Sequence, residues 1–219
     1  MPVRKIPKNH VSVTGLHATT KSLYHAEFES PLENDYLTLL DFDPAVHSYE
    51  VQPVRVPVPG VQNGYVPDVL VHFRPDADGQ TRPSELTEVK AADDLRANAS
   101  KYAPKFAAAA EYSAERGWLF VKKTEKDIRS PFLANIKFLR RYGRFTPDPA
   151  DLRNLMDALA REGGQSSSTR LIDALSPDAD TRARLLAALW HLVATGQVEV
   201  DLHTAFGGDV PLWLEGAHP

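Results

Sequence analysis

The stretch GYVPDVLVHFRPDADGQTRPSELTEVKAA, residues 64–92, predicts two β-strands joined by a polar turn. The first strand begins at Pro67-Asp68 and continues to Phe73, and the second runs from Ser84 to Lys90. The residues between them are rich in Pro, Gly, Asp and Gln, which favour turns. This stretch therefore predicts a β-hairpin, and the rest of the chain is interpreted around it.

The charged residues of this hairpin fall on one side of it. Side chains alternate between the faces of a strand, so Asp68, Leu70 and His72 share one face, and Glu88 and Lys90 share a face of the second strand. If the two strands pair, Asp68 and Glu88 converge at one end with Lys90 beside them. We interpret His72, which lies deeper along the strand, as structural rather than as a ligand.

Two carboxylates and a lysine at a sheet edge suit metal-dependent hydrolysis of a phosphodiester. Carboxylate oxygens hold Mg²⁺ or Mn²⁺, and the metal activates water and neutralises the charge that develops on the phosphate. A nearby lysine can orient or deprotonate that water. The same three residue types also occur together on ordinary solvated strands, so the motif alone leaves both interpretations open.

The composition limits the class of protein. The chain has 219 residues, 42% of them apolar, which suits one large or two small domains with a real core. It has no cysteine, which excludes disulfides, thiolate metal sites and a cysteine nucleophile and fits a reducing cytoplasm. The first fifteen residues lack the apolar core of a signal peptide, and no apolar run is long enough to span a membrane.

The charge is unevenly distributed. The net charge is −4, which argues against a protein that coats nucleic acid through bulk charge. Residues 122–144 nevertheless carry eight basic side chains against two acidic ones, and residues 1–26 carry four basic and no acidic ones. From Pro149 onward there are five basic and ten acidic residues. A phosphate backbone would be attracted to the earlier patches and repelled by the last third, although ordinary solvated helix faces explain many of these charges equally well.

A helix is expected to begin at Ser30. Ser30 is a favourable N-cap, Pro31 suits the first helical position, and Glu33 has the spacing of a capping box. Glu33 lies at the edge of the apolar stripe of this helix, so it either only caps the helix or also points toward Asp68 and Glu88.

The elements that follow predict an α/β domain. The pattern predicts strands between Val46 and Val58, a turn at Asn63-Gly64, a helix over residues 94–116, a strand over residues 118–121 and a basic helix that ends at Gly143. The order is helix, three strands, helix, strand, helix.

This order resembles the restriction-endonuclease-like nuclease core, a mixed sheet flanked by helices, and more narrowly the TnsA family, the endonuclease subunit of heteromeric transposases. The resemblance covers roughly residues 15–145 and rests on several stretches in sequence order: residues 28–33 and 37–43, 46–53, 67–71, 86–90 and 117–121. Several ordered motifs are more specific than three charged residues.

The resemblance implies a set of site residues. Glu33, Asp68, Glu88 and Lys90 would be catalytic. Glu33, Asp68, Glu88 and the carbonyl of Val89 would hold Mg²⁺, for which Mn²⁺ could substitute, and Lys90 would act on the nucleophilic water.

Further polar residues are candidates for contact with DNA. Gln52 could contact water or phosphate, or could be a strand residue bonded to backbone. Lys101 and Lys105 lie one helical turn apart and could contact phosphate or form a solvated face. The full set of candidates is Gln52, Lys101, Lys105, Lys122, Lys123, Arg140 and Arg141.

The last third predicts a separate small domain. Three short amphipathic helices are followed by strands over residues 198–202 and 210–214, an order that resembles a winged helix, with which the family ends. The predicted division is a basic arm over residues 1–27, a nuclease domain over 28–147 and a winged-helix-like domain over 148–219. Because DNA affinity depends on phosphate neutralisation, its acidic balance favours protein docking over a strong DNA contact.

The resemblance implies a bacterial DNA endonuclease, cytoplasmic and associated with the nucleoid. It would cut the 5′ strands at transposon ends, while a partner DDE-type transposase joins the 3′ ends. An AAA+ regulator ATPase could contact the C-terminal domain. Two alternatives stay open: a related nuclease of a defence or repair system, and an inert architectural adaptor of a transposition complex.

Overall fold

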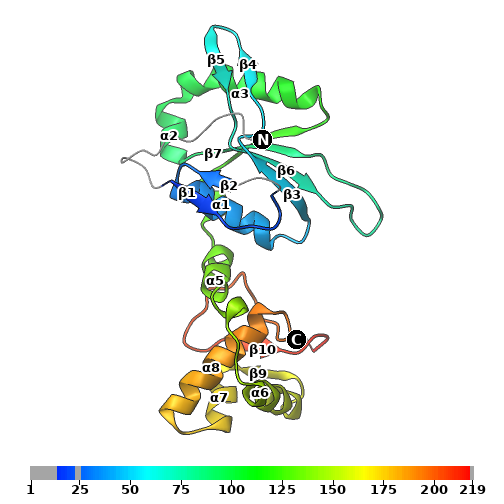
Figure 1. Ribbon diagram of the computed structural model, residues 1–219, viewed down its shortest axis with the longest axis vertical. Coiled ribbons are helices and arrows are strands. Elements are labelled where there is room, and N and C mark those ends of the chain that lie inside the picture. Colours follow the sequence, from blue (N-terminus) through cyan, green and yellow to red (C-terminus); the bar gives the residue numbers. More distant parts are fainter. Residues whose placement is uncertain (1–13, 23–25, 218–219) are drawn as a thin grey trace. The chain divides into compact units, whose positions relative to one another are not determined.

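The computed structural model describes residues 14–22 and 26–217, so most of the predicted basic arm lies outside the described residues (Figure 1). The chain divides into two compact units, Met1–Arg129 and Ser130–Pro219. This division falls earlier than the predicted one after residue 147. The reason is that helix α5 (Pro131–Leu139) buries Leu139 in the apolar core of the second unit, with Phe138 packed against that core.

The first unit combines short strands with helices. Its elements are β1 (Gly15–His17), β2 (Ala26–Phe28), α1 (Pro31–Phe42), β3 (Val46–Val51), β4 (Val56–Val58), β5 (Val61–Tyr65), β6 (Val69–Phe73), β7 (Glu85–Val89), α2 (Ala92–Ala97), α3 (Ala99–Ala114), β8 (Leu119–Lys123) and α4 (Glu125–Ile128).

The central sheet has the strand order β3-β6-β7-β8. Strand β6 runs antiparallel to both β3 and β7, whereas β7 and β8 are parallel, so the sheet is mixed as predicted. Val69 lies opposite Thr87, and Leu70 lies opposite Leu86. The predicted hairpin is therefore confirmed, with Asp68 and Glu88 one residue further along the same register.

Helices α1 and α3 cover opposite faces of this sheet (Figure 1). On the α1 face, the Tyr36 hydroxyl lies 3.3 Å from Thr87 Oγ1. On the α3 face, Leu70 and Leu86 are buried in one cluster with Ala109. The strict alternation of side chains thus places Asp68, Glu88 and Lys90 on the α3 face.

Three local predictions meet different outcomes. Helix α1 begins as predicted, because Ser30 Oγ accepts a hydrogen bond from the Glu33 N–H at 3.2 Å and Pro31 is the first helical residue. The helix expected over residues 94–116 is divided at Asn98 into α2 and α3. The turn predicted at Asn63-Gly64 is wrong: those residues lie within β5, and the turn falls at Pro59-Gly60, where Gly60 adopts a φ of 76°.

The second unit is mainly helical. Its apolar core includes Leu155, Leu171 and Leu189, one from each of three helices. In the residues described for the whole chain, no helix is long and apolar enough to cross a membrane. The elements of this unit are α5, the 3₁₀ helix η1 (Tyr142–Arg144), α6 (Pro149–Arg161), β9 (Gln165–Ser167), α7 (Ser168–Leu175), α8 (Ala179–Ala194) and β10 (Pro211–Trp213).

The hairpin predicted near the end of the chain is confirmed only in part, because Glu199 and Trp213 exchange backbone hydrogen bonds at 2.8 and 3.1 Å but no longer ladder forms. Strand β10 pairs antiparallel with β9, and residues 198–202 contribute only an isolated bridge between Glu199 and Trp213. The chain after that bridge is held instead by the buried Asn135, whose Nδ2 donates to the carbonyls of Leu202 and Thr204 at 2.9 and 2.8 Å. Strand β10 therefore has two neighbours, the expected segment at Glu199 and the unpredicted strand β9.

Candidate active site

Three predicted site residues lie side by side where the strands of the central sheet end. The Gln52 N–H donates to the Asp68 carbonyl at 2.7 Å, and the Asp68 N–H donates to the Thr87 carbonyl at 3.0 Å. The antiparallel pairing of β3, β6 and β7 therefore continues one residue beyond the ends of these strands. Gln52, Asp68 and Glu88 occupy neighbouring positions as a result.

Asp68, Glu88 and Lys90 are brought together as predicted. Asp68 Oδ2 accepts a hydrogen bond from the Val89 N–H at 2.7 Å, which fixes one carboxylate oxygen against the end of β7. Lys90 Nζ lies 3.2 Å from Glu88 Oε1. Glu88 is buried, with only 4% of its surface exposed, so this ion pair is shielded from water on the Glu88 side.

Tyr65 holds the other oxygen of Glu88. Its hydroxyl donates to Glu88 Oε2 at 2.6 Å from the end of β5. Burial and the Glu88 charge raise the pKa of Tyr65 far above its usual range, so the hydroxyl stays a donor at every ordinary pH. The sequence interpretation missed this residue, because only the turn at Pro59-Gly60 determines that the end of β5 returns to the site.

The capping role predicted for Glu33 is confirmed, and its charge also acts on Asp68. Its two carboxylate oxygens accept hydrogen bonds from the Glu29 N–H at 2.7 Å and from Ser30 Oγ at 2.9 Å, so it caps α1. Burial raises its pKa, against the hydrogen bonds from Glu29 and Ser30 and the smaller effect of the positive charge of Lys90. The Glu33 charge in turn contributes to the raised pKa of Asp68, which places Glu33 within electrostatic reach of the site.

The site carries more negative than positive charge. Burial raises the pKa of Asp68 well above its usual value, and the charges of Glu88 and Glu33 raise it further, against the opposing effect of Lys90. Burial alone would lower the pKa of Lys90, but Glu88 and Asp68 outweigh it and raise that pKa. Lys90 is therefore a firmly protonated cation here. The single positive charge of Lys90 does not balance the carboxylates of Asp68, Glu88 and Glu33.

This donor set fits a divalent cation held by few protein ligands. Within residues 14–22 and 26–217, no group of three or more His, Cys, Asp or Glu side chains has the spacing of a ready metal site. Both carboxylate oxygens of Glu33 already accept hydrogen bonds, from the Glu29 N–H and Ser30 Oγ. Mg²⁺ is commonly bound by one or two carboxylates and keeps several waters. Asp68 and Glu88 are two such carboxylates, and the excess of negative charge around them would attract the cation.

Gln52 and Glu29 complete the polar surroundings. Gln52 is buried, with 5% of its surface exposed, and its Nε2 donates to Glu29 Oε1 at 3.1 Å. The alternative of a strand residue whose side chain binds backbone does not describe this contact. Glu29 was not among the predicted site residues. Its only sequence signal was its place just before the cap residue Ser30.

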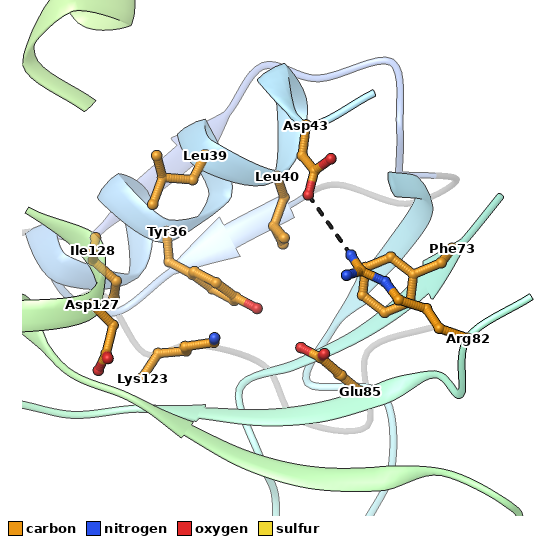
Figure 2. A pocket seen from close by; sticks show the side chains of 10 residues that line it. All are labelled: Tyr36, Leu39, Leu40, Asp43, Phe73, Arg82, Glu85, Lys123, Asp127 and Ile128. Carbon is orange, nitrogen blue, oxygen red and sulfur yellow. Dashed lines mark ion pairs between the residues drawn. The ribbon is translucent and has the colours of Figure 1, made fainter. Parts of the chain in front are cut away.

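The neighbouring lysines of β8 face opposite ways. Lys122 lies opposite Glu88 in the parallel register, with its Nζ 5.5 Å from the centre of the Phe106 ring on the α3 face. Lys123 lies opposite Val89 and lines a pocket of about 250 Å³ on the α1 face, together with Tyr36 (Figure 2). Of these two candidates for DNA contact, only Lys122 shares a face with Asp68 and Glu88.

The remaining basic candidates fall in different places. Lys101 is exposed on α3, with its Nζ 5.8 Å from the centre of the Tyr102 ring, and Lys105 is half-buried on the same helix. Arg140 and Arg141 belong to the second unit, where the Arg141 guanidinium lies 4.9 Å from the centre of the Phe138 ring. The site described above is built from residues of the first unit.

His72 has the contacts of a structural residue. Its Nδ1 lies 2.9 Å from Ser84 Oγ, and its Nε2 lies 3.7 Å from Glu50 Oε1. These partners tie the hairpin to β3, away from the strand ends that carry Asp68 and Glu88.

A mixed sheet flanked by helices, with carboxylates and a lysine meeting at one end, fits the core of a nuclease. The sequence models of known families agree with this class. The model described as TnsA-like endonuclease N terminal matches residues 43–125, and the model described as TnsA endonuclease C terminal matches residues 127–202. The chain belongs to the TnsA family of endonucleases. No curated protein is similar enough to the chain to count as a match.

The matched regions also bear on the site and on the division of the chain. Asp68, Glu88 and Lys90 lie inside the first matched region, whereas Glu29 and Glu33 precede it, so their place in the site depends on the hydrogen bonds and charges described above. The two matched regions meet between residues 125 and 127, close to the boundary between the two compact units.

Proposed function

We propose that this protein is the metal-dependent DNA endonuclease subunit of a heteromeric transposase and cuts the 5′ strands at the transposon ends. Mg²⁺ is the proposed cofactor, with Mn²⁺ able to replace it. The observation that carries the proposal is the convergence of Asp68, Glu88 and Lys90 at one end of the sheet in a chain of the TnsA family.

Each residue has a distinct part in the proposed reaction. Asp68 and Glu88 would hold the cation, with the Val89 carbonyl between them in sequence as a further oxygen donor. When bound, Mg²⁺ would lower the pKa of a water molecule and offset charge on the phosphate. Tyr65 keeps the Glu88 carboxylate in place through its 2.6 Å hydrogen bond.

Lys90 has an electrostatic part in this proposal. The charges of Glu88 and Asp68 raise its pKa in the cation-free protein, and a cation on those carboxylates would offset that effect. Lys90 would stabilise charge that develops on the phosphate oxygens and orient or deprotonate the water.

We further propose that the second unit docks onto protein partners, namely the DDE-type transposase subunit and an AAA+ regulator. The support for this is its charge: from Pro149 onward the chain has ten acidic and five basic residues, which suits a protein surface better than a phosphate backbone. A winged-helix-like arrangement of this unit remains part of the proposal.

The test is strand-specific cleavage of a labelled transposon end in the presence of the partner transposase and Mg²⁺. Asp68→Ala and Lys90→Ala should abolish cutting of the 5′ strand, and Asp78→Ala, which removes an exposed carboxylate from the β6–β7 turn, should cut like the wild type. Equal cutting by all four proteins would refute the catalytic assignment.

Titration calorimetry separates an enzyme from an inert adaptor. The wild type should bind Mg²⁺, and Asp68→Ala should remove that binding. A wild-type protein that binds no divalent cation would support the adaptor, since an adaptor needs no cation at this site.

A further inference from the structure

Gln52 has a backbone conformation that its sequence does not favour. Among the described residues other than glycine, it alone has a positive φ, at 48°. This left-handed region is disfavoured for a residue with a long side chain, and the residue before a proline, here Pro53, normally adopts an extended conformation. Conformations of this kind persist where the surrounding structure enforces them, and they concentrate at functional sites.

The side chain of Gln52 adds a second unfavourable feature. Its Nε2 donates to Glu29 Oε1, and because a carboxylate only accepts hydrogen bonds, this contact determines which end of the amide carries the oxygen. The carbonyl Oε1 therefore points the other way, and in the described part of the chain it is buried without a hydrogen-bond partner. Buried acceptors without a partner are rare in folded proteins, so this oxygen calls for a donor or a cation.

The hydrogen bonds around Gln52 indicate which donor or cation its carbonyl oxygen would meet. Its backbone N–H donates to the carbonyl of Asp68, and its side chain binds Glu29, whose own N–H donates to Glu33 Oε2. Gln52 is thus bonded on one side to Asp68 and linked on the other side, through Glu29, to Glu33. Asp68 is a proposed ligand of the cation, and the charge of Glu33 acts on Asp68.

We propose that the carbonyl oxygen of Gln52 is an additional acceptor of the cation site and takes a hydrogen bond from a water molecule bound to the cation. This inference rests on the proposed metal dependence. Hydrated Mg²⁺ presents water O–H donors around it, and a buried carbonyl on the residue next to Asp68 would be satisfied by such a donor when the cation is present. Gln52 is then a positioning residue, which acts on the reaction through that water.

Two variants separate the carbonyl from the backbone strain. Gln52→Gly removes the carbonyl and also relieves the positive φ, because glycine adopts it freely. Gln52→Met removes the carbonyl, keeps a side chain of similar length and retains the strain. Both variants should weaken Mg²⁺ binding about tenfold, as expected for loss of a group around a metal. Both variants also lose the hydrogen bond to Glu29 Oε1, so the backbone strain is measured by their difference: the cation-free protein should melt at a higher temperature with Gln52→Gly than with Gln52→Met.

Ser113→Ala is the matched control. Ser113 Oγ is the other buried side-chain atom without a partner in the described part of the chain. It lies on α3 near the start of β8, where the Trp118 N–H donates to its carbonyl, at the opposite end of the sheet. Removing this oxygen should raise the melting temperature and leave Mg²⁺ affinity unchanged.

The measurements are titration calorimetry with Mg²⁺ and thermal unfolding without it, on the full chain. If the wild type binds Mg²⁺, Asp68→Asn abolishes binding, and both Gln52 variants bind as tightly as the wild type, then the inference about Gln52 is wrong while the proposed function stands. If the wild type binds no divalent cation, both are wrong.

Discussion

Each face of the central sheet carries a polar cluster around an aspartate, and the two clusters differ in how well they stabilise the charge of that aspartate. On the α1 face, Asp41 accepts hydrogen bonds from Thr19 Oγ1 at 2.6 Å and Tyr49 OH at 3.1 Å, and His17 Nε2 lies 2.8 Å from its other oxygen. Burial opposes ionisation of Asp41, but the contacts with His17 and Thr19 outweigh it and lower its pKa. The surroundings of Asp41 therefore stabilise its ionised form.

On the α3 face, Asp68 has the opposite surroundings. It accepts one backbone hydrogen bond from Val89, and its pKa is raised by burial and by the charges of Glu88 and Glu33. If Asp68 only formed polar contacts within the protein, we would expect several hydrogen-bond donors around it, as there are around Asp41. The Asp41 cluster thus stabilises its charge within the protein, whereas the Asp68 cluster lacks positive charge, which the proposed cation would supply.

The largest expected effect comes from replacing each aspartate by asparagine. Asp68→Asn should reduce cleavage at least about a hundredfold, because a neutral amide binds a cation poorly. It should also raise the free energy of unfolding by about 0.5–2 kcal/mol, since it removes a repelled charge and keeps an acceptor for the Val89 N–H. The measurements are strand cleavage and urea denaturation without divalent cations. A large loss of stability would show that Asp68 is a structural residue.

Asp41→Asn is the matched change in the balanced cluster. It should lower the free energy of unfolding by about 1–3 kcal/mol, because the amide group presents donors to the donors of Thr19, Tyr49 or His17. Mg²⁺ affinity of the folded variant should equal that of the wild type. If this variant loses cation binding without losing stability, the two clusters do not differ in the way proposed.

The same comparison predicts opposite pH dependences. The folded-state pKa of Asp41 lies below its ordinary value of 3.8, so its stabilisation is present above that pH and is lost as the pH falls through the lower folded-state pKa. The folded-state pKa of Asp68 lies above 3.8, so its contribution is fully present below that pH and is lost as the pH rises through the raised pKa.

Urea denaturation across a range of pH, in the wild type and both asparagine variants, measures these contributions. The stability difference between wild type and Asp68→Asn should become less favourable to the wild type as the pH rises above about 4. The difference for Asp41→Asn should shrink as the pH falls below about 4. Parallel curves for the two variants would contradict the contrast between the clusters.

The parts of the fold and site that follow from local patterns could be predicted from the sequence. Alternation in the strands correctly placed Asp68 and Glu88 at one end of a hairpin, and the Ser30–Glu33 spacing correctly predicted the cap. The resemblance identified the family. These features depend on neighbours in sequence and on the strict two-residue period of a strand.

The rest depends on tertiary contacts. Tyr65 reaches Glu88 only because β4 and β5 turn at Pro59-Gly60, and a turn predicted four residues later hid this. The positive φ of Gln52 has no sequence signature, since any strand residue before a proline is expected to be extended. The division between the units depends on where Leu139 packs, which a helix pattern alone does not reveal.

A smaller effect is expected at Tyr65. Tyr65→Phe removes the hydrogen bond to Glu88 Oε2 and frees that oxygen, so Mg²⁺ affinity should fall about fivefold, which corresponds to about 1 kcal/mol. Tyr36→Phe is the matched control, because Tyr36 is also buried and its hydroxyl contacts Thr87 on the α1 face. Titration calorimetry measures the Mg²⁺ affinity of both variants. Equal affinities for the two variants would remove Tyr65 from the site.

The smallest expected effect separates the two neighbouring lysines of β8. Lys122 shares the face of Asp68, so Lys122→Ala should weaken DNA binding a few-fold and reduce the slope of log affinity against log salt by about 1, the change expected for one lost phosphate contact. Lys123 lines the pocket on the α1 face, so Lys123→Ala should leave that slope unchanged. The two variants remove the same charge from adjacent positions, and any difference between them therefore reports which face of the sheet meets DNA. A reduced slope for Lys123→Ala alone would place the DNA on the face of Asp41 and separate it from the proposed site.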